Sequence, residues 1–227
     1  MSTIFMAVLC VFPSTAIPDP TVPSNMLSQY VRARTAEFDK ISNERKTDLD
    51  RLADYVTQRV QSKKRVQLIF ICTHNSRRSH ISQIWASVAA AEYGVEGVET
   101  FSGGTEATAF NPRAIAAMHR AGLEIKRLSE DANPKYQVRF SERREPLLCF
   151  SKKYDDESNP QTDFCAVMTC SQADQGCPLV RGADLRIALP FDDPKAADGT
   201  PGETARYDER CLQIAREMLY VFSRVQR

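Results

Sequence analysis

An apolar segment that runs directly into a short polar loop is the feature of this chain that most constrains its fold. Residues 66–72 read Val-Gln-Leu-Ile-Phe-Ile-Cys, and the polar stretch that follows ends in Arg78 and Ser79. A loop of backbone N–H groups that closes onto a helix N-terminus binds tetrahedral oxyanions and lowers the pKa of a cysteine thiol. The pattern therefore predicts a strand, an anion-binding loop and a helix, with Cys72 as a nucleophile.

Several side chains of this loop suit oxyanion chemistry. Arg78, six positions after Cys72, can offer the planar fork of its guanidinium to two oxygens of the anion. Ser79 can donate a hydrogen bond to the thiolate or to the leaving sulfur. A lone cysteine at the end of a core strand is more often buried and inert, but the spacing, the arginine and the serine together favour a nucleophile. The predicted oxyanion-binding residues are Thr73, His74, Asn75, Ser76, Arg77 and Arg78.

Strand and helix patterns alternate after the loop. The predicted helices are 79–93, 111–122 and 203–225, and the predicted later strands are 98–102, 163–169 and 187–191. This alternation predicts an α/β fold with an open parallel sheet and helices on both faces. Cys72 then lies at the carboxyl end of the first strand, where open sheets bind ligands.

The 227 residues, 42% of them hydrophobic, are enough for one globular domain with an appendage. We expect a disordered or signal-like extension at 1–25, a helical arm at 26–64 and a catalytic domain at 65–227. The arm has no proline or glycine from residue 27 to 63 and predicts two helices, or one helix with a break near Ser42 and Asn43. It either packs against the catalytic domain or forms an oligomer contact.

An inserted segment at about 130–160 interrupts the alternating pattern. Residues 136–140 and 147–150 flank a charged run and predict a β-hairpin, and residues 151–162 read as a polar loop.

Charge and the N-terminal sequence limit the partners and the location. The 30 basic and 29 acidic side chains give no electrostatic case for binding nucleic acid or an anionic membrane. The apolar run at residues 4–12 is far too short for a membrane span and lacks the preceding positive charge of a signal peptide. We expect a cytoplasmic protein, with secretion left open, and a monomer.

A second cysteine motif follows the strand predicted at 163–169. Cys170 and Cys177 lie seven positions apart, which places two sulfurs on one face of a helix at about 10 Å, too far for a disulfide unless the segment unwinds. In a loop they could meet. Two unrelated half-buried cysteines are the plainer interpretation of this pair taken alone, and the presence of Cys72 weighs against it. The spacing differs from that of zinc ribbons and of paired redox cysteines.

The other cysteines and the histidines give no sign of a metal site. Cys149, Cys165 and Cys211 lie in apolar patterns and are expected in the core. The three histidines, His74, His80 and His119, show no metal-ligand spacing, so we predict no metal and no bound cofactor.

Four motifs together resemble the low-molecular-weight tyrosine phosphatase superfamily. They are the loop 72–79, Ser102-Gly-Gly-Thr-Glu106, Asn111-Pro112 and Asp193-Pro194. The segment 170–178 and the sequence Phe191-Asp-Asp-Pro194 narrow the resemblance to the thioredoxin-coupled arsenate reductase branch. It covers roughly residues 66–225 without 130–160, and neither the arm nor the hairpin belongs to the usual pattern.

The resemblance implies a mechanism with three thiols. Cys72 attacks bound arsenate while Asp193, rather than Asp192, protonates the departing oxygen, because family members place the acid immediately before proline. Cys170 then attacks the sulfur of the adduct and releases arsenite. Cys177 moves the disulfide to a Cys170–Cys177 pair, which thioredoxin reduces as electron donor.

Two loop positions depart from the family pattern. His74 stands where glycine is usual, so a side chain there alters the loop, carries protons or serves packing. Arg77 stands where other members are often smaller or have a second thiol, and either adds positive charge for the oxyanion or faces solvent.

Two other functions remain open. The same loop could hydrolyse phosphomonoesters through a phosphocysteine, with Asp193 as acid and without need of Cys170 or Cys177. Lys195 weighs against phosphotyrosine, since phosphatase members tend to have a tyrosine there. A noncatalytic redox or anion sensor would use Cys170 and Cys177 as a switch and leave Cys72 idle.

Overall fold

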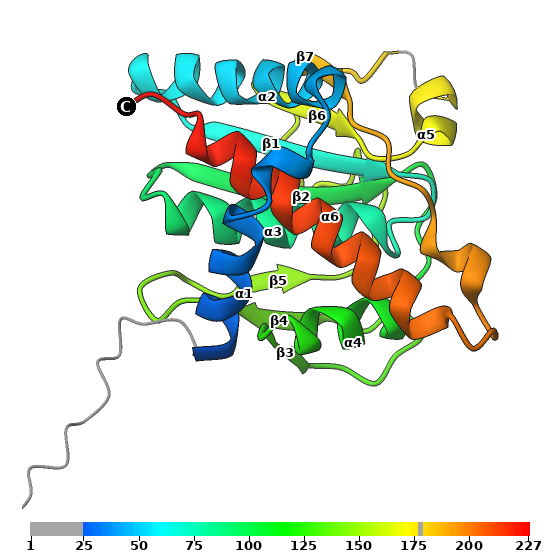
Figure 1. The fold of residues 1–227 in the computed structure, drawn as a ribbon. Helices are drawn as coiled ribbons and strands as arrows, with labels where there is room; N and C mark the ends of the chain where they lie inside the picture. Colours follow the sequence, from blue (N-terminus) through cyan, green and yellow to red (C-terminus); the bar gives the residue numbers. More distant parts are fainter. Residues whose placement is uncertain (1–24, 177–178) are drawn as a thin grey trace, which may run out of the picture.

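A four-stranded parallel sheet forms the centre of the protein (Figure 1). The computed structural model describes residues 25–176 and 179–227. β1 (Val66–Cys72) lies between β2 (Val98–Gly104) and β6 (Phe164–Met168), and β7 (Ala183–Ala188) completes the order β2-β1-β6-β7. All three pairings are parallel, which confirms the predicted α/β fold. The extension expected at 1–25 lies, except for Asn25, outside the described residues.

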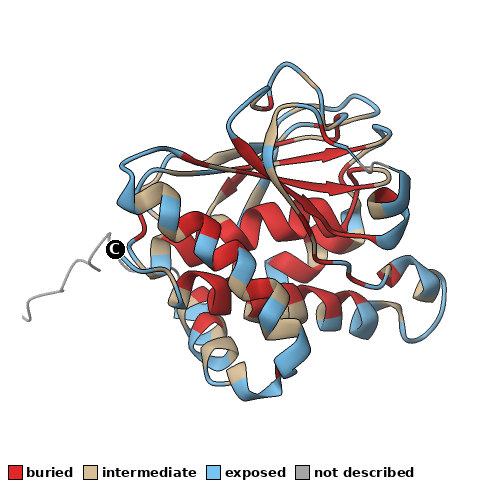
Figure 2. Ribbon diagram, turned by 90° about the horizontal axis from the view of Figure 1, so that it is seen from above, coloured by how far each residue is buried: buried red, intermediate tan, exposed pale blue. Residues whose placement is uncertain are grey.

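The two faces of the sheet bury alternate residues of β1. Leu68 and Phe70 belong to a large core with the helices, whereas Ile69 and Ile71 belong to a smaller core on the other face. This period of two is what a pleated strand imposes. β1 has every residue except Gln67 buried, as expected for a strand covered on both faces. Figure 2 shows the burial concentrated in the strands and in the helix sides that face them.

The large core lies under α3 (Arg78–Glu92), α4 (Pro112–Arg120) and α6 (Glu203–Ser223), close to the predicted ranges. Asn111 caps α4 by accepting hydrogen bonds from Arg113 N and Ala114 N at 2.9 and 3.3 Å, and proline follows at the first turn. On the other face, α5 (Ser171–Gly176) is the helix that contributes to the smaller core, through Ala173, and loop residues complete it.

The N-terminal arm is two helices that share the large core. α1 (Asn25–Thr35) and the short 3-10 helix η1 (Phe38–Lys40) precede α2 (Asn43–Gln61). The predicted break is confirmed, because Ser42 caps α2 by accepting a hydrogen bond from Arg45 N at 3.2 Å. The apolar sides of both helices pack inside the chain, so the arm lies against the predicted catalytic domain. The division at 26–64 and 65–227 stays our proposal, since both parts share one core.

A second, antiparallel sheet lies beside α4 with the order β3-β4-β5 (Figure 1). β4 (Tyr136–Arg139) pairs with β5 (Leu147–Cys149), which confirms the predicted hairpin. β3 (Glu124–Arg127) was not predicted, because its sequence Glu-Ile-Lys-Arg contains a single apolar residue.

One strand was predicted at the wrong residues. The last strand of the parallel sheet is β7 at Ala183–Ala188, not residues 187–191. Charged residues at 184 and 186 alternate with the apolar Leu185 and Ile187, and this alternation concealed the start of the strand. η2 (Pro194–Ala197) was also not predicted.

Candidate active site

The polar loop joins the end of β1 to the start of α3, as the sequence predicts. Cys72 is the last residue of β1 and is paired in register with Gly104 of β2. Gly104 has no room for a side chain: a Cβ there would lie 2.3 Å from Glu106 O and 2.7 Å from both Asn75 N and Thr73 O. β2 therefore needs glycine at position 104, because the polar loop after Cys72 passes directly against it. Gly104 belongs to the motif Ser102-Gly-Gly-Thr-Glu106, and the close approach of the loop explains its physical role.

A chain of hydrogen bonds orients the hydroxyl of Ser79 next to the Cys72 thiol. Ser79 Oγ lies 3.1 Å from Cys72 Sγ and accepts a hydrogen bond from Asn75 Nδ2 at 2.9 Å. Asn75 Oδ1 in turn accepts from Lys152 N at 2.8 Å. Because the Ser79 oxygen already accepts from Asn75, its own proton is free to point at Cys72. Lys152, in the stretch predicted only as a polar loop, is a contributor that the sequence did not reveal.

The left-handed backbone of the loop occurs at Asn75, with a φ of 43°, and not at His74. Asparagine tolerates this conformation better than most residues. The His74 carbonyl accepts hydrogen bonds from Thr108 Oγ1 and Ser151 Oγ at 3.0 and 3.1 Å. The His74 ring lies at the rim, with Nε2 3.7 Å from Glu106 Oε2. The loop therefore accommodates a side chain at position 74.

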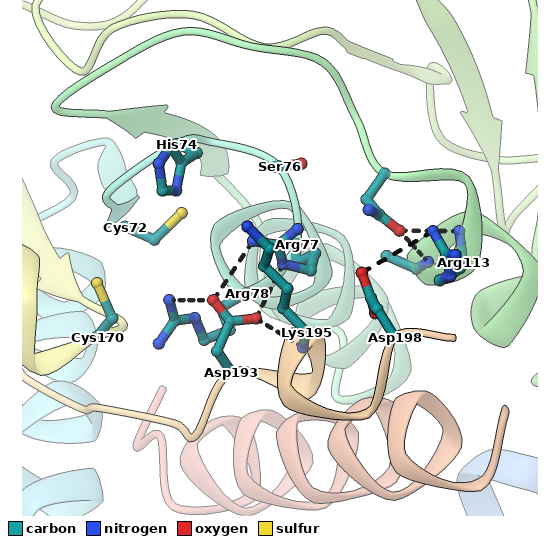
Figure 3. Close-up of polar contacts among 12 residues, drawn as sticks. Cys72, His74, Ser76, Arg77, Arg78, Arg113, Cys170, Asp193, Lys195 and Asp198 are labelled. Carbon is teal, nitrogen blue, oxygen red and sulfur yellow. Dashed lines mark hydrogen bonds and ion pairs between the residues drawn. The ribbon is translucent and has the colours of Figure 1, made fainter. Parts of the chain in front are cut away.

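Arg77 and Arg78 both contact Asp193 (Figure 3). Arg78 donates to Asp193 Oδ2 at 2.8 Å and to the Phe191 carbonyl at 2.9 Å. Arg77 donates from Nε to Asp193 Oδ1 at 2.9 Å and from Nη2 to Oδ2 at 3.4 Å. Arg77 is buried, so the alternative that it faces solvent is wrong. Asp192 instead points outward and pairs with Arg210.

The surroundings of Asp193 act on its pKa in opposite directions. Burial by itself would raise the pKa of Asp193, but the charge of Arg78, the Lys195 N–H and the charge and hydrogen bonds of Arg77 hold this pKa below its ordinary value. A cavity of about 630 Å³ opens over this cluster. Its lining residues are His74, Arg77, Arg78, Ser171, Gln172, Phe191, Asp192, Asp193, Lys195 and Ala196.

Cys170 lies beside the loop, on the same side of the arginine–aspartate cluster as Cys72 (Figure 3). It is buried between β6 and α5, and its Sγ accepts a hydrogen bond from Ala173 N at 3.3 Å. The same Sγ lies 3.5 Å from the hydroxyl of Thr73, the residue next to Cys72. Cys177 and Pro178 lie outside the described residues.

Among the residues that the structure describes, Cys149, Cys165, Cys211 and His80 are buried away from the cavity. Burial raises the pKa of Cys149 to about 12 and that of Cys211 to about 11, and it also raises that of Cys165. His80 stacks on Phe110 with ring centroids 4.0 Å apart, and burial lowers its pKa to about 3. The three cysteines lie in the core as expected, and none of these four residues lines the cavity.

Over the described ranges 25–176 and 179–227, no group of three or more His, Cys, Asp or Glu residues could hold a metal ion. Within the same part of the chain, no helix has the length and apolar character needed to cross a membrane.

Comparison with known proteins places the chain in a family. The family model for low molecular weight phosphotyrosine protein phosphatases matches residues 67–139, from β1 to the end of β4. Arsenate reductase 2 of Staphylococcus epidermidis is 30% identical over 128 residues, which cover 56% of this chain and 77% of that protein. The chain belongs to the low-molecular-weight protein tyrosine phosphatase superfamily.

Other members of the superfamily extend the comparison. An arsenate reductase of Halalkalibacterium halodurans is 28% identical over 136 residues, covering 60% of this chain and 79% of that protein. The solved low-molecular-weight protein tyrosine phosphatase of T. tengcongensis covers 70% of this chain and 96% of its own, with a TM-score of 0.46 and 14% identity. The relatives named as arsenate reductases are enzymes, so the prediction of an enzyme is confirmed. The matched region begins after both helices of the arm.

Proposed function

We propose that this enzyme reduces arsenate to arsenite through Cys72 and a relay of thiols. The observation that carries the proposal is the position of Cys170, whose sulfur lies 3.5 Å from the hydroxyl of Thr73, the residue that follows Cys72 in the chain. Phosphoester hydrolysis has no use for a second thiol at that place. The relatives named as arsenate reductases support the same choice.

In the first step the Cys72 thiolate attacks the arsenic atom of the bound anion. The loop N–H groups and Arg78 bind the remaining oxygens, and the N-terminus of α3 favours their negative charge. A sulfur–arsenic bond forms, and one oxygen departs as water. The resemblance assigns protonation of this oxygen to Asp193, whose carboxylate lies against both loop arginines. Dihydrogen arsenate also brings both protons of the departing water itself.

In the second step the Cys170 thiolate attacks Cys72 Sγ. A Cys72–Cys170 disulfide forms, the sulfur–arsenic bond breaks, and its electron pair stays on arsenic, which leaves as arsenite. The two thiols thus lose two electrons and arsenic gains them. Cys177 then attacks Cys170, frees Cys72 and presents the new disulfide to thioredoxin. The role of Cys177 and the donor rest on the sequence alone.

Arsenate-dependent NADPH oxidation, measured with thioredoxin and thioredoxin reductase, tests this proposal. Cys72→Ser, Cys170→Ser and Cys177→Ser should each abolish turnover. Cys149→Ser is the matched control, because this buried thiol belongs to the core away from the cavity and its loss should leave turnover intact. Turnover that survives in Cys170→Ser would contradict the relay.

The second candidate is phosphomonoester hydrolysis, which the family model's description favours. The same loop would form a phosphocysteine that water resolves. Hydrolysis of p-nitrophenyl phosphate that persists in Cys170→Ser and Cys177→Ser, is lost only in Cys72→Ser, and is accompanied by no arsenate reduction would make the protein a phosphatase.

A further inference from the structure

The carboxylate of Asp193 is surrounded by hydrogen-bond donors. Its Oδ1 accepts from Arg77 Nε at 2.9 Å and from Lys195 N at 3.0 Å. Its Oδ2 accepts from Arg78 Nη2 at 2.8 Å and from Arg77 Nη2 at 3.4 Å. A carboxylate offers about four acceptor positions, so all of them point at N–H groups. A proton on either oxygen would face one of these donors.

Arg77 is the member of this cluster that can hold Asp193 during the reaction. Arg78 has to turn its guanidinium toward the bound oxyanion if it acts as proposed. Arg77 contacts both carboxylate oxygens by itself and is about as buried as Arg78, with 10% and 9% of the side chains exposed. The contact between Arg77 and Asp193 can therefore persist when Arg78 turns toward the oxyanion.

An Asp193 that stays ionised throughout the reaction would distinguish substrates by whether their leaving oxygen already carries a proton. When thiolate attacks dihydrogen arsenate, the two protons of the substrate leave with one oxygen as water, and the thiol–arsenate adduct keeps both negative charges. A phosphomonoester has a second pKa of about 6 and carries no such proton at neutral pH. Its alcohol or phenol must then depart as an anion unless an acid protonates it.

We propose that Arg77 is a specificity-determining residue that, by pairing with Asp193, removes it as a proton donor and restricts the site to oxyanions whose leaving oxygen brings its own proton. Free arsenate meets this condition and phosphomonoesters with basic leaving groups do not. The inference rests on the proposed arsenate reduction, for which it names the basis of substrate choice.

Two esters that differ in their leaving group test the proposal. p-Nitrophenyl phosphate releases a stable phenolate, whereas phenyl phosphate needs a proton, so the ratio of their kcat/KM values reports acid assistance. The wild-type ratio should be large. In Arg77→Gln it should fall by about tenfold or more, because general acid catalysis typically contributes 10²–10⁴-fold. Adding Asp193→Asn to Arg77→Gln should restore the wild-type ratio.

Arg120→Gln is the control, since Arg120 also contacts both oxygens of an aspartate, Asp208, at a more exposed place away from the cavity, and its loss should leave the ratio unchanged. If Arg77→Gln does not fold, the single variant Asp193→Asn tests the proposal. We then expect little change in the ratio of the two kcat/KM values, because Asp193 already donates no proton. A ratio that is unchanged in folded Arg77→Gln, or that rises about tenfold in Asp193→Asn alone, overturns the proposal.

Failure of this inference and failure of the proposed function are distinguishable. Ester ratios that follow the pattern in a protein that does not reduce arsenate would refute the reductase and leave the role of Arg77 intact. Arsenate reduction by a protein whose ester ratio does not respond to Arg77→Gln would refute the role of Arg77 and leave the reductase intact.

Discussion

Replacing Arg45 of the arm should destabilise the whole protein, because its partner is a buried carboxylate. Arg45 Nε and Nη2 lie 2.9 and 2.8 Å from Oε2 of Glu217, whose side chain is 3% exposed. Arg45→Met leaves that charge uncompensated, which costs about 3–5 kcal/mol at fully buried pairs. Since Arg45 itself is 17% exposed and Gln213 still donates to Glu217 at 3.0 Å, we expect a loss of about 3 kcal/mol.

Urea unfolding followed by tryptophan fluorescence measures this loss. Trp85 is the single tryptophan of the chain and stacks on Tyr30 of the arm at 5.3 Å, so it reports on unfolding of the shared core. The double variant Arg45→Met/Glu217→Leu should lie within about 1 kcal/mol of wild type, because no unpaired charge remains. The exposed Arg51→Met on the same helix is the control.

A free energy of unfolding reduced by less than about 1 kcal/mol in Arg45→Met would refute this reasoning, as would a double variant no more stable than the single one. The arginine also lies 4.9 Å from the Phe191 ring, whose carbonyl accepts the hydrogen bond from Arg78. Arg45→Met should therefore also lower kcat at temperatures where it remains folded.

Two further predictions concern the active site. Gly104→Ala places a Cβ 2.3 Å from Glu106 O, so it should displace the oxyanion loop and lower arsenate turnover about a hundredfold, while Gly202→Ala, whose nearest contact is 3.7 Å, should leave it unchanged. The lowered pKa of Asp193 stabilises the fold above the ordinary aspartate pKa, and this contribution is lost as the pH falls through the lower folded-state value. Melting curves should show Asp193→Asn below wild type at neutral pH, with the difference closing in acid; a constant difference would contradict the ion pair.

Local sequence patterns were enough to predict the strand, loop and helix around Cys72. Alternating apolar residues, the cap at Asn111 and the break at Ser42 all act within a few residues, so the sequence carries them directly. β3 and the start of β7 were missed because charged residues interrupt their apolar pattern.

The contacts that define the site could not be predicted in the same way. The pair between Arg77 and Asp193 joins residues 116 positions apart, and burial of Arg77 depends on where η2 packs. Lys152 supports Asn75 through a backbone N–H, which no side-chain motif reveals. The resemblance to a family supplied Asp193 as a candidate, but only the fold shows which donors surround it.

A single-turnover experiment tests the central claim most directly. Reduced Cys177→Ser protein is mixed with one equivalent of arsenate, without thioredoxin, and its disulfides are mapped by mass spectrometry while arsenite is quantified. The account predicts a Cys72–Cys170 disulfide and an equal amount of arsenite, with neither in Cys170→Ser. Recovery of both thiols in reduced form, with no arsenite released, would contradict it.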